Sequence, residues 1–94
     1  MDKKELQEKA REETYKDYKE DIDKINEYAL ASAFLGFFGF EWFRVRTKNV
    51  DEFGLVDSTF MSRIGGYYRS LGFDCDVSMC DGGKSLLIKL DWGN

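Results

Sequence analysis

The sequence predicts an α+β fold in a single domain, residues 1–94, with a long N-terminal helix followed by a β-α-β-β unit. Residues 2–34 contain no glycine or proline and are rich in strong helix formers. Residues 40–47, and again the residues after Gly72, alternate apolar and polar side chains, which is typical of strands. A hydrophobic content of 43% in 94 residues suffices for one compact core but not for two ordinary domains.

The first element is a helix of about 30 residues with one apolar face. At 100° per residue, Ser32 lies at the edge of this face, which is formed by Tyr15, Tyr18, Ile22, Ile25, Ala29 and Ala33. We expect this face to pack on the rest of the chain. Further towards the N-terminus, charged Lys4 and Arg11 occupy the same stripe. Residues 1–12 are therefore expected to project from the body or to fray.

A strand over 40–47 and a loop over 49–54 precede the second helix. Asp57 or Ser58 is a suitable N-cap for that helix, and Gly72 is a suitable stop. Its expected apolar positions are Phe60, Ile64, Tyr67, Tyr68 and Leu71. The pair Gly65-Gly66 within it predicts either close packing on the sheet or a break in the helix.

The last segment predicts a β-hairpin. Apolar and polar residues alternate on both sides of the turn Asp81-Gly82-Gly83. The inward-facing residues would be Phe73, Cys75, Val77 and Met79, then Leu86, Ile88, Leu90 and Trp92. Together with strand 40–47, this hairpin gives a small three-stranded, antiparallel-containing sheet packed against the helices.

The composition argues against catalysis. The chain has no histidine, so the commonest general acid or base and the Ser-His and Cys-His nucleophile pairs are missing. Cys75 and Cys80 are too far apart on one extended segment for a disulfide, and they do not make a zinc set. We expect a non-enzyme with two free thiols, no cofactor, no metal site and no catalytic residue.

Acidic side chains follow the exposed side of the first helix. Those opposite the apolar stripe include Glu5, Glu12, Glu13, Asp17, Glu20, Asp23 and Glu27. One interpretation is a solvated face stabilised by the pairs Glu5-Lys9, Glu12-Lys16 and Glu20-Lys24. The other is a partner-binding acidic face, because carboxylates on a rigid helix can imitate phosphate spacing and steer a basic partner.

Large apolar side chains crowd the segment between the first helix and the first strand. They outnumber what one face of a short strand can bury, so some are expected at the surface. Self-association to a homodimer, through this segment or through the long helix, is one hypothesis, and a homo-oligomeric structural protein is an alternative function. The candidate residues are Phe34, Phe37, Phe38, Phe40 and Trp42.

A basic and aromatic strand offers an alternative function. Trp42, Arg44, Arg46 and Lys48 alternate on one side of strand 40–47, an arrangement that can stack bases and contact phosphates. The net charge of −4 opposes this role, because the long-range field of the chain repels nucleic acid. The purely structural interpretation is an edge strand whose charged side chains prevent it from pairing with a strand of another chain.

The charged N-terminal helix and the compact unit from Ser58 to Trp92, with Leu71-Gly72-Phe73 leading into the strands, resemble small proteins that bacteriophages make early to disable host machinery. Several of those proteins are acidic DNA mimics. The resemblance implies an inhibitor or adaptor that binds a host protein, for example a basic DNA-binding protein.

The start of the chain lacks an apolar signal segment, and Tyr28 to Phe40 is too short to span a bilayer. We therefore expect a cytoplasmic protein, in a bacterial host cell, with no membrane contact.

Overall fold

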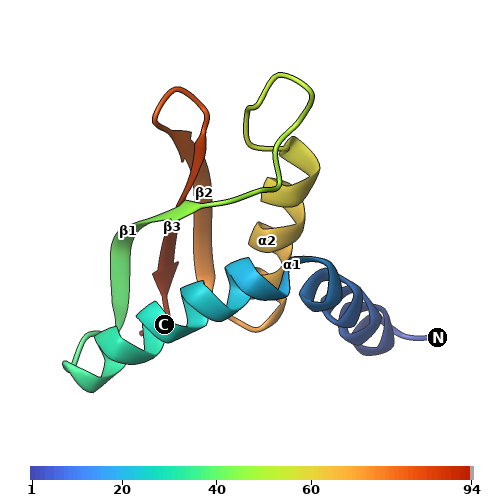
Figure 1. Cartoon of the computed structure of the whole chain (residues 1–94). Coiled ribbons are helices and arrows are strands. Elements are labelled where there is room, and N and C mark those ends of the chain that lie inside the picture. The colour runs from blue at the N-terminus through green and yellow to red at the C-terminus, as the bar shows by residue number, and fades with distance from the viewer. Residues whose placement is uncertain (94) are drawn as a thin grey trace.

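The computed structural model describes residues 1–93 and confirms the α+β fold class. Two helices and three strands follow one another in the predicted order (Figure 1). Their bounds are α1 Lys3–Phe34, β1 Gly39–Arg46, α2 Ser58–Ser70, β2 Asp74–Cys80 and β3 Ser85–Asp91. The N-cap of α2 is Asp57, whose carboxylate accepts a hydrogen bond from the N–H of Thr59 at 3.1 Å.

The three strands form one antiparallel sheet in the order β1-β3-β2. Helix α1 contacts β1, and α2 contacts β2. Val45 of β1 is buried, whereas its neighbours Arg44 and Arg46 point the other way and are exposed. Asp76 and Ser78 of β2 are exposed in the same manner. Both helices therefore cover one face of the sheet and leave the other to solvent.

The core lies between that covered face and the two helices. It is built by α1 and α2 side chains packed on alternate residues of the strands. The fully buried members with the largest side chains are Tyr68, Phe60, Ile22, Ile25, Ile64, Leu86, Ile88, Leu90 and Val45.

Helix α1 is not straight. Tyr18 has non-helical backbone angles, φ −126° and ψ 31°, and the helix changes direction there (Figure 1). No proline or glycine lies nearby, so we attribute the kink to packing. The Tyr18 ring meets Phe60 edge-on at 4.8 Å and lies under the Arg63 guanidinium at 4.7 Å. The N-terminal half can thereby follow α2, with Arg11 donating to the Ser70 carbonyl at 3.3 Å.

Both helices end in the same Leu-Gly-Phe motif. At the end of α1, the Phe37 N–H donates to the Ser32 carbonyl at 3.1 Å, and the Gly36 N–H donates to the Ala33 carbonyl at 2.9 Å. At α2, the Phe73 N–H donates to Tyr68 and the Gly72 N–H donates to Arg69. Gly36 and Gly72 have φ of +89° and +95°, so each helix ends in a Schellman motif that needs glycine.

Some details of the sequence-based prediction were wrong. Strand β1 begins and ends one residue earlier than expected, at Gly39 and Arg46, and it carries a bulge between Phe40 and Phe43. Ala33 is exposed, and Ser32, which was expected at the edge of the apolar face, is buried instead. Two further predicted inward residues, Leu71 and Met79, are each 48% exposed.

The glycine pair does not break α2, and its first member lies at the contact between α2 and β2. Gly65 is buried, and a Cβ atom there would lie 3.0 Å from the guanidinium of Arg69. That guanidinium donates to the Cys75 carbonyl at 3.1 Å. Gly65 therefore leaves room for a bond between α2 and β2, while a Cβ at Gly66 would meet nothing within 4 Å.

Candidate functional site

An exposed apolar surface marks the turn from α1 into β1. Five large side chains within nine consecutive residues lie mostly in solvent, and we call them the apolar corner. They are Leu30, Phe34, Leu35, Phe37 and Phe38, with exposed fractions of 59%, 83%, 77%, 60% and 72%. No charged residue occurs between Tyr28 and Phe40, so the corner has an uncharged centre.

A comparison of the two helix ends explains why Phe37 is exposed. In a Schellman motif, the residue after the glycine contacts the side chain five positions earlier. At the end of α2, the ring centroid of Phe73 lies 5.8 Å from that of Tyr68 and 6.3 Å from that of Trp92. At the end of α1, the corresponding position is Ser32, which offers Phe37 no apolar partner. The motif therefore ends α1 without the hydrophobic contact that usually accompanies it, and the Phe37 ring stays exposed.

An apolar groove of about 370 Å³ lies beside the corner. Its lining comes from both sides of the turn: Tyr28, Ala31, Ser32, Leu35, Phe37, Gly39, Phe40 and Glu41. The Tyr28 ring stacks on Phe43 at 4.1 Å and meets Phe40 edge-on at 5.0 Å. Aromatic contacts therefore hold the part of the groove formed by Tyr28 and Phe40, while Leu35 and Phe37, which also line it, remain exposed.

The residues predicted for self-association divide into two groups. Phe34, Phe37 and Phe38 belong to the apolar corner. Phe40 is partly buried, since its ring packs against Tyr28 and Trp92. Trp42 lies in the bulge of β1 and is 47% exposed.

The kink at Tyr18 divides the predicted acidic face. Glu5, Glu12, Glu13 and Asp17 precede it, whereas Glu20, Asp23 and Glu27 follow it on a segment with another direction (Figure 1). A straight row of carboxylates along one rigid helix, as the sequence analysis assumed, is therefore not present.

Ion pairs also neutralise part of this face. Of the predicted pairs, Lys24 does meet Glu20 at 3.5 Å, but Lys9 pairs with Glu13 and Lys19 with Asp23. Arg63 of α2 reaches Asp17 at 2.9 Å. Within residues 1–93, Glu5, Glu12 and Glu27 make no ion pair, so they carry the uncompensated negative charge of the seven.

Asp23 is the most strongly held carboxylate of the acidic face. It accepts hydrogen bonds from Lys19 at 2.7 Å and from the Tyr15 hydroxyl at 2.8 Å. These bonds, that of Lys19 above all, lower the pKa of the Asp23 carboxyl. The same contact with Asp23 raises the pKa of Tyr15.

Carboxylates lie near the basic residues of β1 and of the segment that follows it. Arg44 forms an ion pair with Asp81 of the hairpin turn at 3.1 Å. Arg46 and Lys48 line a polar pocket of about 380 Å³, to which α1 contributes acidic side chains. The acidic members of its lining are Asp17, Glu20 and Asp21. The structure does not gather Trp42, Arg44, Arg46 and Lys48 into a surface free of negative charge.

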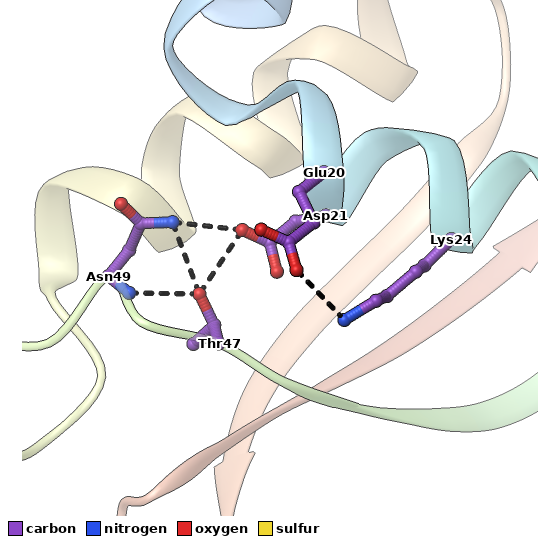
Figure 2. A network of polar contacts seen from close by, with 5 residues as sticks. All are labelled: Glu20, Asp21, Lys24, Thr47 and Asn49. Atoms are coloured by element: carbon purple, nitrogen blue, oxygen red, sulfur yellow. Dashed lines mark hydrogen bonds and ion pairs between the residues drawn. The ribbon is translucent and has the colours of Figure 1, made fainter.

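Asp21 is a buried carboxylate that the sequence analysis missed. It is 5% exposed, and it accepts hydrogen bonds from Thr47 at 3.2 Å and from the Asn49 side chain at 2.8 Å (Figure 2). Thr47 in turn accepts from the Asn49 N–H at 3.0 Å. Burial raises the pKa of Asp21, which these bonds oppose. Its place on the apolar stripe between Tyr18 and Ile25 was the available signal.

Neither cysteine has the features of an activated nucleophile. Both thiols are free, and burial raises the pKa of Cys75 to about 11. Burial, then the nearby Asp81 carboxylate, also raises the pKa of Cys80. Among residues 1–93, no three acidic or thiol side chains are grouped so that they could hold a metal ion. In the same part of the chain, no helix is both long and apolar enough to cross a bilayer.

Comparison with known protein families, with curated proteins and with solved structures found no match to this chain. The resemblance to early bacteriophage proteins therefore stays a prediction from the sequence.

Proposed function

We propose that this chain is a non-enzymatic protein-binding module, an adaptor or inhibitor, and that it binds protein through the apolar corner. The observation that carries the proposal is the exposure of Phe34, Leu35, Phe37 and Phe38 around an apolar groove. Contiguous apolar patches on soluble proteins commonly mark interaction sites, especially where they are rich in aromatic side chains.

The size of the corner supports this role. A phenylalanine side chain buries about 150–250 Å² when it is fully covered. With exposed fractions between 60% and 83%, Phe34, Phe37 and Phe38 together present several hundred Å². Since the largest patch on a typical monomer is about 300–600 Å², this corner is at the size where a function is expected.

The acidic face has a secondary part in the proposal. Glu5, Glu12 and Glu27, which are not paired within residues 1–93, would attract a basic partner over a distance set by the ionic strength. The kink and the ion pairs favour this steering role over imitation of a continuous DNA backbone. Action as a DNA mimic on a host nucleic-acid-binding protein stays a prediction.

Photocrosslinking tests the proposal. A photoreactive benzoylphenylalanine replaces Phe34 in the corner or, as the matched control, Phe53, which is 78% exposed in the loop before α2. After irradiation of cells that produce the chain, we expect position 34 to form protein adducts several-fold more often than position 53. Equal yields at the two positions would contradict the proposal, and adducts mainly with nucleic acid would favour the alternative function.

A further inference from the structure

We infer that the protein bound at the apolar corner is a second copy of this chain, in a two-fold symmetric dimer. The inference rests on the proposed function, because it names the partner of the same surface. In such a dimer, both copies use the same surface patch, and each contact between two residues occurs twice.

The distribution of charge permits this pairing. A two-fold interface places like side chains close together, so charged residues at its centre would repel one another. None occurs between Tyr28 and Phe40, and the exposed carboxylate of Glu41, which also lines the groove, would have to stay at the solvent edge of the interface. The excess of acidic residues lies on α1 before this segment, and Figure 1 shows that the N-terminal half of α1 is at the far end of the molecule. Charges separated by more than about 8 Å are largely screened at physiological salt, so the net charge of −4 opposes dimerisation only weakly.

The apolar area of the corner suits a weak dimer. With Leu30 and Leu35 added to the three phenylalanines, the corner presents on the order of 500–600 Å² of side chain. A standard interface buries about 800 Å² on each partner, and weak ones bury less than about 600 Å². Tyr28, which lines the groove and is 40% exposed, can supply part of the remainder.

The corner contains both a protruding ring and a groove that can accept one. Phe34 is 83% exposed, and the adjacent Leu35 lines the apolar groove of about 370 Å³. A cavity of about 150 Å³ holds a benzene ring, so this groove has room for a phenylalanine side chain. A two-fold axis at the corner would allow each copy to insert a ring into the groove of the other. Such an aromatic anchor in an apolar pocket is the usual centre of a stable interface.

The position of β1 gives a further reason for a partner here. β1 pairs only with β3, so it is an edge strand of the sheet, and it begins at Gly39 beside the corner. Its next residues, Phe40 to Phe43, include three aromatic side chains. The bulge between Phe40 and Phe43 already limits pairing along this edge, and a dimer through the corner would limit access to its first residues further.

Sedimentation velocity of the purified chain, from low to high micromolar concentration, tests the inference. We expect a shift from 11.0 kDa to twice that mass as concentration rises. Phe34→Glu and Phe38→Glu should each weaken the dimer about 30-fold or more, because each places a charge in an apolar interface. Phe53→Glu is the matched control, with the same substitution at an equally exposed ring, and should leave the dimer unchanged. Circular dichroism verifies that each variant is folded, and Phe34→Ser replaces any glutamate variant that is not.

Two results would overturn the inference. One is a parent chain that stays monomeric at high micromolar concentration. The other is a dimer that the corner variants leave intact, since the interface would then lie elsewhere. If the parent is monomeric but position 34 still crosslinks to a different protein, the dimer is wrong and the proposed function stands. Failure of the proposed function requires that crosslinking at position 34 also falls to the level of position 53.

Discussion

At the scale of single residues, Asp21 shows how hydrogen bonds reduce the free-energy cost of burying a carboxylate. Its carboxylate lies under the segment after β1 and accepts bonds from Thr47 and Asn49 (Figure 2). Burial raises its pKa, so the ionised form is less favourable in the folded chain than in the unfolded one. The bonds recover part of this cost and fix the path of the chain from β1 towards α2.

Replacement of Asp21 by asparagine tests this interpretation. Asparagine keeps an oxygen that can accept both hydrogen bonds but removes the buried charge. Because the pKa of Asp21 is raised on folding, the parent loses stability as the pH rises through that pKa, and the variant does not. Relative to the parent, Asp21→Asn should therefore gain stability between acidic and neutral pH, by about 1 kcal/mol or less. Urea denaturation at pH 4 and pH 7 measures the difference.

The matched variant removes a donor instead of the charge. Asn49→Ala leaves the carboxylate buried with one bond fewer, which should cost about 1–3 kcal/mol at pH 7 and less at low pH. The account of Asp21 is wrong if Asp21→Asn is the more damaging change and its effect does not vary with pH.

At this scale, the sequence predicted many of the buried residues but misplaced a few. Ile22, Ile25, Phe60 and Ile64 were found from periodicity alone, because helical spacing fixes which side chains share a face. Ala33 was misplaced by one position, since the buried side of α1 beyond Ile25 includes Ser32. The burial of Asp21 depends on Thr47 and Asn49, which only the tertiary fold brings near it.

At the scale of elements, the order of helices and strands was predictable because each carries a strong local signal. Alternation defined the hairpin, and the capping residue and the glycine defined α2. The kink in α1 was not predictable, because it has no local signal and follows from packing of Tyr18 against Phe60 and Arg63. The exposed corner was predicted from the number of aromatic residues, but the groove beside it was not.

The acidic face of α1 gives a prediction at this scale. Replacement of the three unpaired glutamates Glu5, Glu12 and Glu27 by glutamine should leave the helix intact, since glutamine is nearly as helix-favouring. Recovery of basic proteins from a bacterial lysate by the immobilised chain should fall several-fold at 0.1 M salt. At 0.5 M salt, where exposed charges are screened, the parent and the variant should differ little.

The control for this experiment is the pair Arg44→Gln and Arg46→Gln. Steering by the acidic face predicts no loss of protein recovery in that variant. If instead the arginine variant fails and the glutamate variant binds as well as the parent, the open face of the sheet is the binding surface.

At the scale of the whole molecule, the arrangement separates two surfaces. The apolar corner lies at one end of α1, and the uncompensated carboxylates Glu5 and Glu12 lie towards the other end (Figure 1). A dimer through the corner would leave both acidic N-terminal halves exposed. One chain can thus combine self-association with attraction of a basic partner, because the two tasks use different parts of α1.

Hydroxyl-radical footprinting of the phenylalanine side chains tests directly whether a partner covers the apolar corner. Phe34 and Phe53 are of the same residue type and have nearly equal exposure, 83% and 78%, so the ratio of their oxidation rates reports on coverage of the corner. In dilute purified chain, we expect a ratio near one. In cells that produce the chain, where a binding partner is present, the rate at Phe34 should fall several-fold while the rate at Phe53 does not change. A ratio that stays near one in the cell would mean that nothing covers the corner, and it would contradict the account.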